Sequence, residues 1–183
     1  KMLLSNFFGE KVYELLEDLK RQDIYPVVYS FKEETERLSY VKGKSTIGQQ
    51  AYLNSRKGDK RINPVDNFSR LADGKIFYIT CIDQKEKLLP ILEKYQSTFR
   101  CLYQKDYYAE DYWLEIMPKG ISKANAAIKL KELLGCEKLV VFGDEINDID
   151  LFKAADEAYA VENAVDELKA LATGIIKSNN EDG

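Results

Sequence analysis

The segment KLVVFGDEIND, residues 138 to 148, indicates the fold class of this chain. Its four consecutive apolar residues, 139 to 142, predict a strand in a sheet covered on both faces, because such strands are apolar throughout. A turn after a strand needs few polar groups, yet here four follow within six residues: Asp144, Glu145, Asn147 and Asp148. Ligands of open α/β sheets bind beyond the carboxyl ends of strands, so we expect a functional site at this segment.

Helices alternate with short apolar strands after Pro118, and this alternation predicts parallel βα units. Ser122 is expected to cap a helix over residues 123–134, which Gly135 ends. Asn163 is expected to cap a later helix, with Asp166 in a position like that of a capping box. The remaining elements predicted here are strands at 139–142, 159–161 and 174–176 and a short helix around 150–154.

Residues 1–117 have a different pattern, which predicts a mixed α+β domain. Apolar residues at helical spacing predict an amphipathic helix over 10–21. Aromatic, roughly alternating segments at 99–103 and 112–117 predict a pair of strands. Other strands are expected at 24–30, 37–41 and 75–81, with helices near 49–55 and 88–92, whereas 43–66 is otherwise polar and rich in turn residues. The predicted fold class is α/β: part of a doubly wound parallel sheet over 118–183, preceded by this α+β domain.

The composition is that of a globular protein, with 45% hydrophobic and 32% charged residues among 183. A net charge of -4 without a basic run offers no footprint for nucleic acid, and no segment has the length of a membrane span or the pattern of a signal peptide. Cys81, Cys101 and Cys136 lack metal-binding spacing, which favours reduced thiols and a cytoplasmic location. The chain has no histidine, which excludes histidine-based catalysis and histidine-bound zinc by these residues.

The carboxylate of Asp144, at the end of the predicted strand, suits Mg²⁺. This ion is held by one or two carboxylates together with substrate phosphate oxygens. Asn147 can donate to a phosphate oxygen, and Asp148 can hold a lysine or the loop. The spacing fits equally well a simpler structure in which Asp144 and Asn147 only form a turn and cap the next helix.

Lys123 lies in the first turn of the predicted helix 123–134, where the helix dipole disfavours a cation. A lysine placed there can hold an anion that arrives at the helix N-terminus. Taken alone, however, the residue is better explained as a solvated surface lysine.

Four segments in this order resemble the C-terminal part of haloacid dehalogenase superfamily phosphatases, most closely the Cof-type sugar-phosphatase branch, subfamily IIB. They are GISKANAAIKLKELLG (120–135), VVFGDEINDIDLFKAAD (140–156), AYAVENAVDELKALA (158–172) and KSNNEDG (177–183). Residues 1–117 resemble, in architecture only, the α+β cap that this branch inserts into its core. The resemblance implies a Mg²⁺-dependent phosphatase of small phosphorylated metabolites, with sugar phosphates as the expected substrates.

The resemblance also implies residue roles. Lys123 corresponds to the lysine that neutralises the phosphoryl group and the nucleophile, and Asp144 to the magnesium ligand. Asn147 corresponds to a contact to substrate phosphate, and Asp148 to a support of the loop. Asn179 corresponds to a family asparagine expected to brace the site.

The chain departs from the family in one respect. The nucleophile motif D-x-D-x-[TV] is absent, and the only D-x-D, Asp148–Asp150, lies inside the segment that follows the strand. The family reaction passes through an aspartyl-phosphate on that motif. We therefore expect that the first core segment lies outside the residues given, that these residues alone are inactive, and that the strand 139–142 has a parallel neighbour on one side only.

Two other functions stay open on the sequence: a non-catalytic phosphometabolite-binding protein, and a subunit that a partner chain completes. In the family the cap supplies the leaving-group pocket. Tyr107, Tyr108, Tyr112 and Trp113 are candidates to line it, although cross-strand aromatic packing explains most of them better. No feature of the sequence specifies an oligomeric state.

Overall fold

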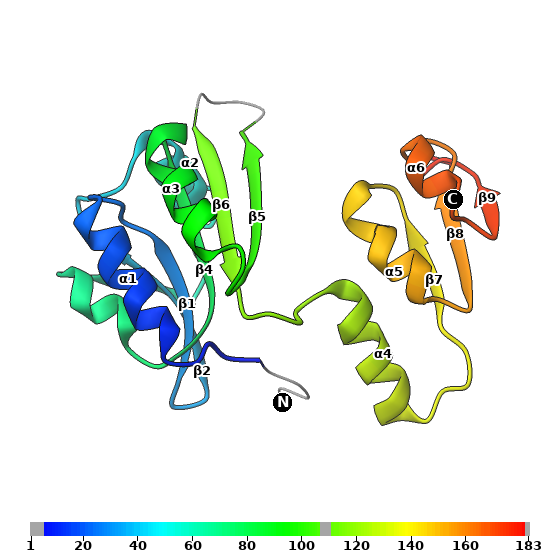
Figure 1. Ribbon diagram of the computed structural model, residues 1–183, viewed down its shortest axis with the longest axis horizontal. Coiled ribbons are helices and arrows are strands. Elements are labelled where there is room, and N and C mark those ends of the chain that lie inside the picture. The colour runs from blue at the N-terminus through cyan, green and yellow to red at the C-terminus, as the bar shows by residue number, and fades with distance from the viewer. Residues whose placement is uncertain (1–5, 107–110, 182–183) are drawn as a thin grey trace. The chain divides into compact units, whose positions relative to one another are not determined.

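The computed structural model describes residues 6–106 and 111–181 (Figure 1). The chain divides into two compact units, Lys1–Lys119 (unit 1) and Gly120–Gly183 (unit 2). The division falls close to Pro118, where the sequence pattern changes. Among the described helices, none combines the length and the apolar character needed to cross a membrane.

Unit 1 is built on a six-stranded sheet with the strand order β3-β2-β1-β4-β6-β5. Neighbouring strands are antiparallel, except for the parallel pair β2 and β3. The strands are β1 (Val27–Lys32), β2 (Thr35–Val41), β3 (Ile62–Val65), β4 (Lys75–Asp83), β5 (Arg100–Lys105) and β6 (Tyr112–Met117). The predicted pairing of β5 with β6 is confirmed.

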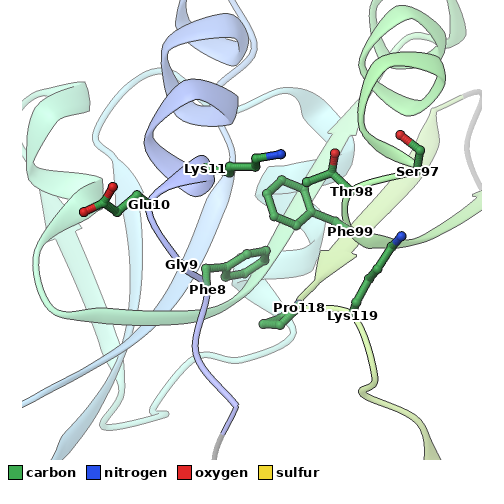
Figure 2. Close-up of a pocket in the computed structure, with 9 residues that line it drawn as sticks. All are labelled: Phe8, Gly9, Glu10, Lys11, Ser97, Thr98, Phe99, Pro118 and Lys119. Atoms are coloured by element: carbon green, nitrogen blue, oxygen red, sulfur yellow. The ribbon is translucent and has the colours of Figure 1, made fainter.

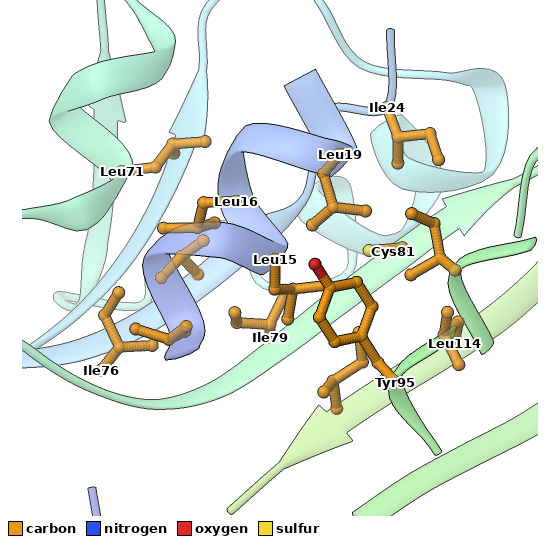
Figure 3. Packing of buried hydrophobic residues seen from close by; sticks show 14 of the residues in the cluster. Leu15, Leu16, Leu19, Ile24, Leu71, Ile76, Ile79, Cys81, Tyr95 and Leu114 are labelled. Atoms are coloured by element: carbon orange, nitrogen blue, oxygen red, sulfur yellow. The ribbon is translucent and has the colours of Figure 1, made fainter. Parts of the chain in front are cut away.

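Helices cover both faces of this sheet. On one face α1 (Lys11–Arg21) and α3 (Lys85–Tyr95) enclose the main core, in which Leu15 and Leu19 pack against Ile79 and Leu114 (Figure 3). On the other face α2 (Ile47–Asn54) places Tyr52 and Leu53 against strand residues of β1, β2 and β4. The short 3₁₀ helix η1 (Phe68–Ala72) completes the main core with Phe68 and Leu71. Unit 1 therefore has a core of its own.

Unit 2 contains a parallel sheet of three strands in the order β7-β8-β9, which confirms the predicted α/β class. One face packs on α5 and α6 through a small core that includes Val141, Phe152 and Leu168. The elements of unit 2 are α4 (Lys123–Leu134), β7 (Val140–Gly143), η2 (Ile146–Asp148), α5 (Ile149–Ala154), β8 (Glu157–Val161), α6 (Asp166–Lys169) and β9 (Gly174–Ile176).

The predicted bounds of α4 are confirmed at both ends. Ser122 accepts a hydrogen bond from the N–H of Asn125 at 3.0 Å, as an N-cap residue does. Gly135 has φ of 64°, a left-handed conformation that glycine adopts without steric cost, and it ends the helix.

Two local predictions are wrong. Asn163 does not cap a helix, because α6 begins after Val165 and has no side-chain cap. The strand β3 lies in the segment predicted to consist mainly of turns. Its signal is weak because Asn63 and Pro64 interrupt the apolar pattern, and a proline is tolerated there since β3 is an edge strand.

The strand β7 is paired on one side only. Within the described residues its partner is β8, so the expectation of a single parallel neighbour is confirmed. The expectation that both faces are covered is wrong for these residues: Val141 is buried, but Val140 and Phe142 on the opposite face are exposed, Phe142 by 61%. Phe142 stacks on Tyr159 of β8, with ring centroids 5.7 Å apart. The described residues thus leave one edge and one apolar face of this sheet open.

Leu114→Ala should destabilise unit 1 strongly, because Leu114 is fully buried in the main core. We expect a loss of about 2–5 kcal/mol in the free energy of unfolding, measured by urea denaturation. Leu102→Ala on the neighbouring strand β5 is the matched control, since Leu102 is exposed. A cost of Leu114→Ala no larger than that of Leu102→Ala would contradict the assigned core.

Candidate active site at the carboxyl edge of the parallel sheet

Three loops follow the carboxyl ends of β7, β8 and β9, at residues 144–148, 162–165 and 177–180. Because the strands are parallel, these loops lie at the same edge of the sheet, where α/β proteins bind ligands. We call them together the carboxyl-edge site. The loops contain four of the five predicted site residues: Asp144, Asn147, Asp148 and Asn179.

Asp148 is the buried charged group of this site, with 4% of its surface exposed. One carboxylate oxygen accepts a hydrogen bond from the ammonium of Lys123 at 2.5 Å, and the other accepts from the N–H of Asp144 at 3.3 Å. A buried carboxylate is tolerated only when it is paired and hydrogen-bonded. These two contacts therefore fix Lys123 and the main chain of Asp144 relative to each other.

Gly143 allows this arrangement sterically. A Cβ atom at this position would lie 2.8 Å from Oδ2 of Asp148 and 2.8 Å from Cε2 of Phe152. Both distances are shorter than the 3.0 Å below which a Cβ atom essentially never approaches another heavy atom. The glycine at the end of β7 is thus required for the close approach of the buried carboxylate.

Lys123 is the first residue of α4, and its side chain is 55% exposed. Besides Asp148, its ammonium contacts Oδ1 of Asn147 at 3.4 Å. The residue is therefore more than a freely solvated surface lysine: an ion pair holds it beside the loop after β7. The structure brings Lys123, Asn147 and Asp148 together.

Asp144 is exposed and is held through its main chain. Its N–H donates to Asp148, and its carbonyl oxygen accepts from the N–H of Val165 at 3.0 Å. Its carboxylate makes no hydrogen bond or ion pair with another described residue, so it is available to a ligand.

The donor set fits Mg²⁺ bound with the help of substrate and water. Among the described residues no three acidic or cysteine side chains come together as a metal cage. Mg²⁺ does not require such a cage, because it commonly takes one or two protein carboxylates and completes its shell with waters and phosphate oxygens. The free carboxylate of Asp144 is the group that would hold the ion.

Asn179 is joined to the site through Asn163, a residue that the sequence analysis placed at a helix cap. Oδ1 of Asn163 accepts hydrogen bonds from the N–H of Asn179 and from Oγ of Ser178, both at 3.1 Å. The sequence signal for this contact was limited to the position of Asn163 two residues after the end of β8 at Val161.

The aromatic candidates for a leaving-group pocket belong to unit 1, whereas these loops belong to unit 2. Tyr107 and Tyr108 lie outside the described residues. Tyr112 stacks on Tyr103 across β5 and β6, with ring centroids 5.4 Å apart. Trp113 packs edge-on against Tyr52 at 5.2 Å, and burial raises the pKa of the Tyr52 hydroxyl. The described pair, Tyr112 and Trp113, thus serves aromatic packing.

Unit 1 also has a cavity of about 460 Å³ that contains none of the predicted site residues (Figure 2). The rings of Phe8 and Phe99 meet in its wall, with centroids 5.1 Å apart. Its other lining residues are Gly9, Glu10, Lys11, Ser97, Thr98, Pro118 and Lys119. This cavity is therefore distinct from the carboxyl-edge site.

Comparisons with known proteins point to one family. A family model described as haloacid dehalogenase-like hydrolase matches residues 2–183. The chain is 40% identical over 126 residues to the 5-amino-6-(5-phospho-D-ribitylamino)uracil phosphatase YwtE of Bacillus subtilis, an alignment that covers 67% of this chain and 43% of that protein. The chain spans about half the length of the curated relatives that it matches first.

Solved structures share the fold. TM0651 from Thermotoga maritima matches with a TM-score of 0.78 and 22% identity over 99% of this chain and 66% of that one. BT4131, described as a haloacid dehalogenase subclass IIB sugar phosphatase, matches with a TM-score of 0.68 and 19% identity over 98% of this chain and 65% of that one. At these identities the likeness concerns the fold alone.

Gly143→Ala should destabilise unit 2, because the added methyl group would overlap the carboxylate of Asp148 and the ring of Phe152. We expect a loss of about 1–3 kcal/mol in the free energy of unfolding, measured by urea denaturation. Gly9→Ala is the control, since nothing lies within 4 Å of a Cβ atom there. Equal stability of the two variants would show that the approach of Asp148 to Gly143 is not tight.

Proposed function

Because the chain belongs to the haloacid dehalogenase-like hydrolases, in their Cof-type branch, we propose that this protein is a Mg²⁺-dependent phosphatase of small phosphorylated metabolites. One observation carries the proposal: Lys123, held by the buried carboxylate of Asp148, lies beside Asn147 in the loop that also carries the free carboxylate of Asp144. A cation, an amide donor and a metal-binding carboxylate are groups that position a phosphoryl group and stabilise its charge during transfer.

Each residue has a distinct role in this proposal. The ammonium of Lys123 stabilises negative charge on the phosphoryl oxygens, and the amide of Asn147 donates to one of them. Asp148 orients Lys123 and braces the loop. Asp144 would hold the metal ion, which when bound supplies further positive charge to the phosphoryl group.

Unit 2 would then be part of the catalytic core, and unit 1 a cap domain. The mixed α+β fold of unit 1 and its separate core support this assignment. In the proposed enzyme the cap determines which ester is accepted. The curated relative named above is a phosphatase of a ribityl phosphate, so we propose sugar phosphates and related polyol phosphates as the substrates of this protein.

These 183 residues lack the D-x-D-x-[TV] motif that would supply the attacking carboxylate. The single D-x-D, Asp148–Asp150, cannot serve, because Asp148 is buried in its pair with Lys123. We propose that a carboxylate from other polypeptide attacks, next to the open edge of β7. A non-catalytic subunit completed by a partner chain is the second candidate, and the same open edge favours it. The complete gene separates the two: a D-x-D-x-[TV] strand in the same reading frame supports the enzyme.

Asp144→Asn should abolish turnover, because the variant loses the charge that holds Mg²⁺. The measurement is phosphate release by the complete gene product from a panel of sugar phosphates, with and without Mg²⁺. Asp166→Asn is the control, since Asp166 is an exposed carboxylate in unit 2 outside the carboxyl-edge site. Metal-independent activity of the unmodified protein, or normal activity of Asp144→Asn at saturating Mg²⁺, would refute the assignment.

Lys123→Ala should lower kcat/KM by at least about a hundredfold, because charge on the transferred phosphoryl group would lose its cationic partner. The variant also leaves the buried carboxylate of Asp148 without its ion pair, so folding must be checked by circular dichroism. Lys129→Ala, on the same helix α4, should retain normal kinetics. If Lys123→Ala folds and keeps near-normal kcat/KM, Lys123 is only a structural residue.

A further inference from the structure

One side-chain oxygen joins two loops of the carboxyl-edge site. Oδ1 of Asn163, in the loop after β8, accepts from the N–H of Asn179 and from Oγ of Ser178, in the loop after β9. Ser178 in turn accepts two hydrogen bonds. Its Oγ accepts from the N–H of Asn180 at 3.4 Å, and its main-chain carbonyl oxygen accepts from the N–H of Glu181 at 2.9 Å. The acceptor on Asn163 therefore holds the beginning of a compact turn.

The loop that carries Asn163 is itself anchored on both sides. The next residue, Ala164, is buried in the core of unit 2, and its N–H donates to the carbonyl oxygen of Val161 at 2.9 Å. The N–H of Val165 donates to the carbonyl oxygen of Asp144 at 3.0 Å. A continuous set of contacts thus runs from the turn at Ser178 and Asn179 through Asn163 to the main chain of Asp144.

Other roles do not account for Asn163. It does not cap α6, and it is exposed, so it does not fill the core. Both of its hydrogen bonds use the same oxygen, and their donors belong to a turn rather than to a strand ladder. Among the described residues, its hydrogen bonds fix the turn against the loop after β8.

We propose that Asn163 is a positioning residue of the active site, an inference that rests on the proposed function. It holds the turn at Ser178 and Asn179 so that the side-chain amide of Asn179, which has no hydrogen-bond partner among the described residues, is available to the bound substrate. Without this contact the turn would have to be ordered when substrate binds, and the lost conformational entropy would weaken binding. This weaker binding affects the bound ground state and the transition state alike, so KM rises while kcat stays nearly constant.

The test is Asn163→Ala in the complete gene product, with two readouts. By NMR, the amide hydrogen of Asn179 should exchange about three- to tenfold faster, as expected for loss of one ordinary hydrogen bond. For the sugar phosphate that the unmodified enzyme hydrolyses best, KM should rise about three- to tenfold with kcat within about twofold. Asn163→Asp retains an acceptor oxygen and should keep the slow exchange of Asn179.

Glu167→Ala is the control, because Glu167 is an exposed residue of the neighbouring helix α6, outside the carboxyl-edge site. It should leave both exchange and kinetics unchanged. Unchanged exchange of Asn179 in Asn163→Ala would overturn the proposal, as would a fall in kcat at constant KM, which indicates loss of folded enzyme. The exchange readout does not depend on catalysis, so failure of the proposed function would appear separately, as absence of activity in the unmodified protein.

Discussion

The burial of the Asp148 carboxylate is the constraint on which the site depends. A charge removed from water must be paired, and here the partners are the ammonium of Lys123 and the N–H of Asp144. The pair joins the first turn of α4 to the loop after β7, although the two are far apart in sequence. Gly143 supplies the space for the carboxylate, and the ring of Phe152 also lies close to this glycine. The positions of the Lys123 ammonium and of the Asp144 main chain thus follow from one buried carboxylate.

The rest of unit 2 extends this arrangement along the carboxyl edge of the sheet. Val165 links the loop after β8 to the main chain of Asp144, and Asn163 links it to the turn after β9. The free edge of β7, in contrast, is not held by other elements. The described residues offer no partner strand there and leave Phe142 exposed. Exposed apolar edges promote association with other polypeptide. In the proposed enzyme, one strand beside β7 would cover this edge and also supply the attacking carboxylate.

The sequence predicted local features well where one residue has one physical role. Ser122 and Gly135 specify the two ends of α4, and the polar residues after β7 mark the edge at which we propose that ligands bind. It predicted poorly where tertiary contacts decide. Asn163 has the appearance of a helix cap, and only the fold brings Ser178 and Asn179 within reach of its oxygen. The strand β3 was missed because its pairing with β2 compensates for a weak local pattern. The sequence indicated that Asp148 can hold a lysine or the loop, and the structure shows that this lysine is Lys123.

The central claim is that phosphate binds at the carboxyl edge of β7, between Lys123 and a metal ion held by Asp144. The most direct measurement is a crystal structure of the complete gene product grown with Mg²⁺ and vanadate, an analogue of the phosphoryl group. The account predicts vanadate in contact with the ammonium of Lys123, and Mg²⁺ bound to the carboxylate of Asp144 and to a vanadate oxygen. Vanadate bound elsewhere, with Asp144 facing only solvent, would contradict it.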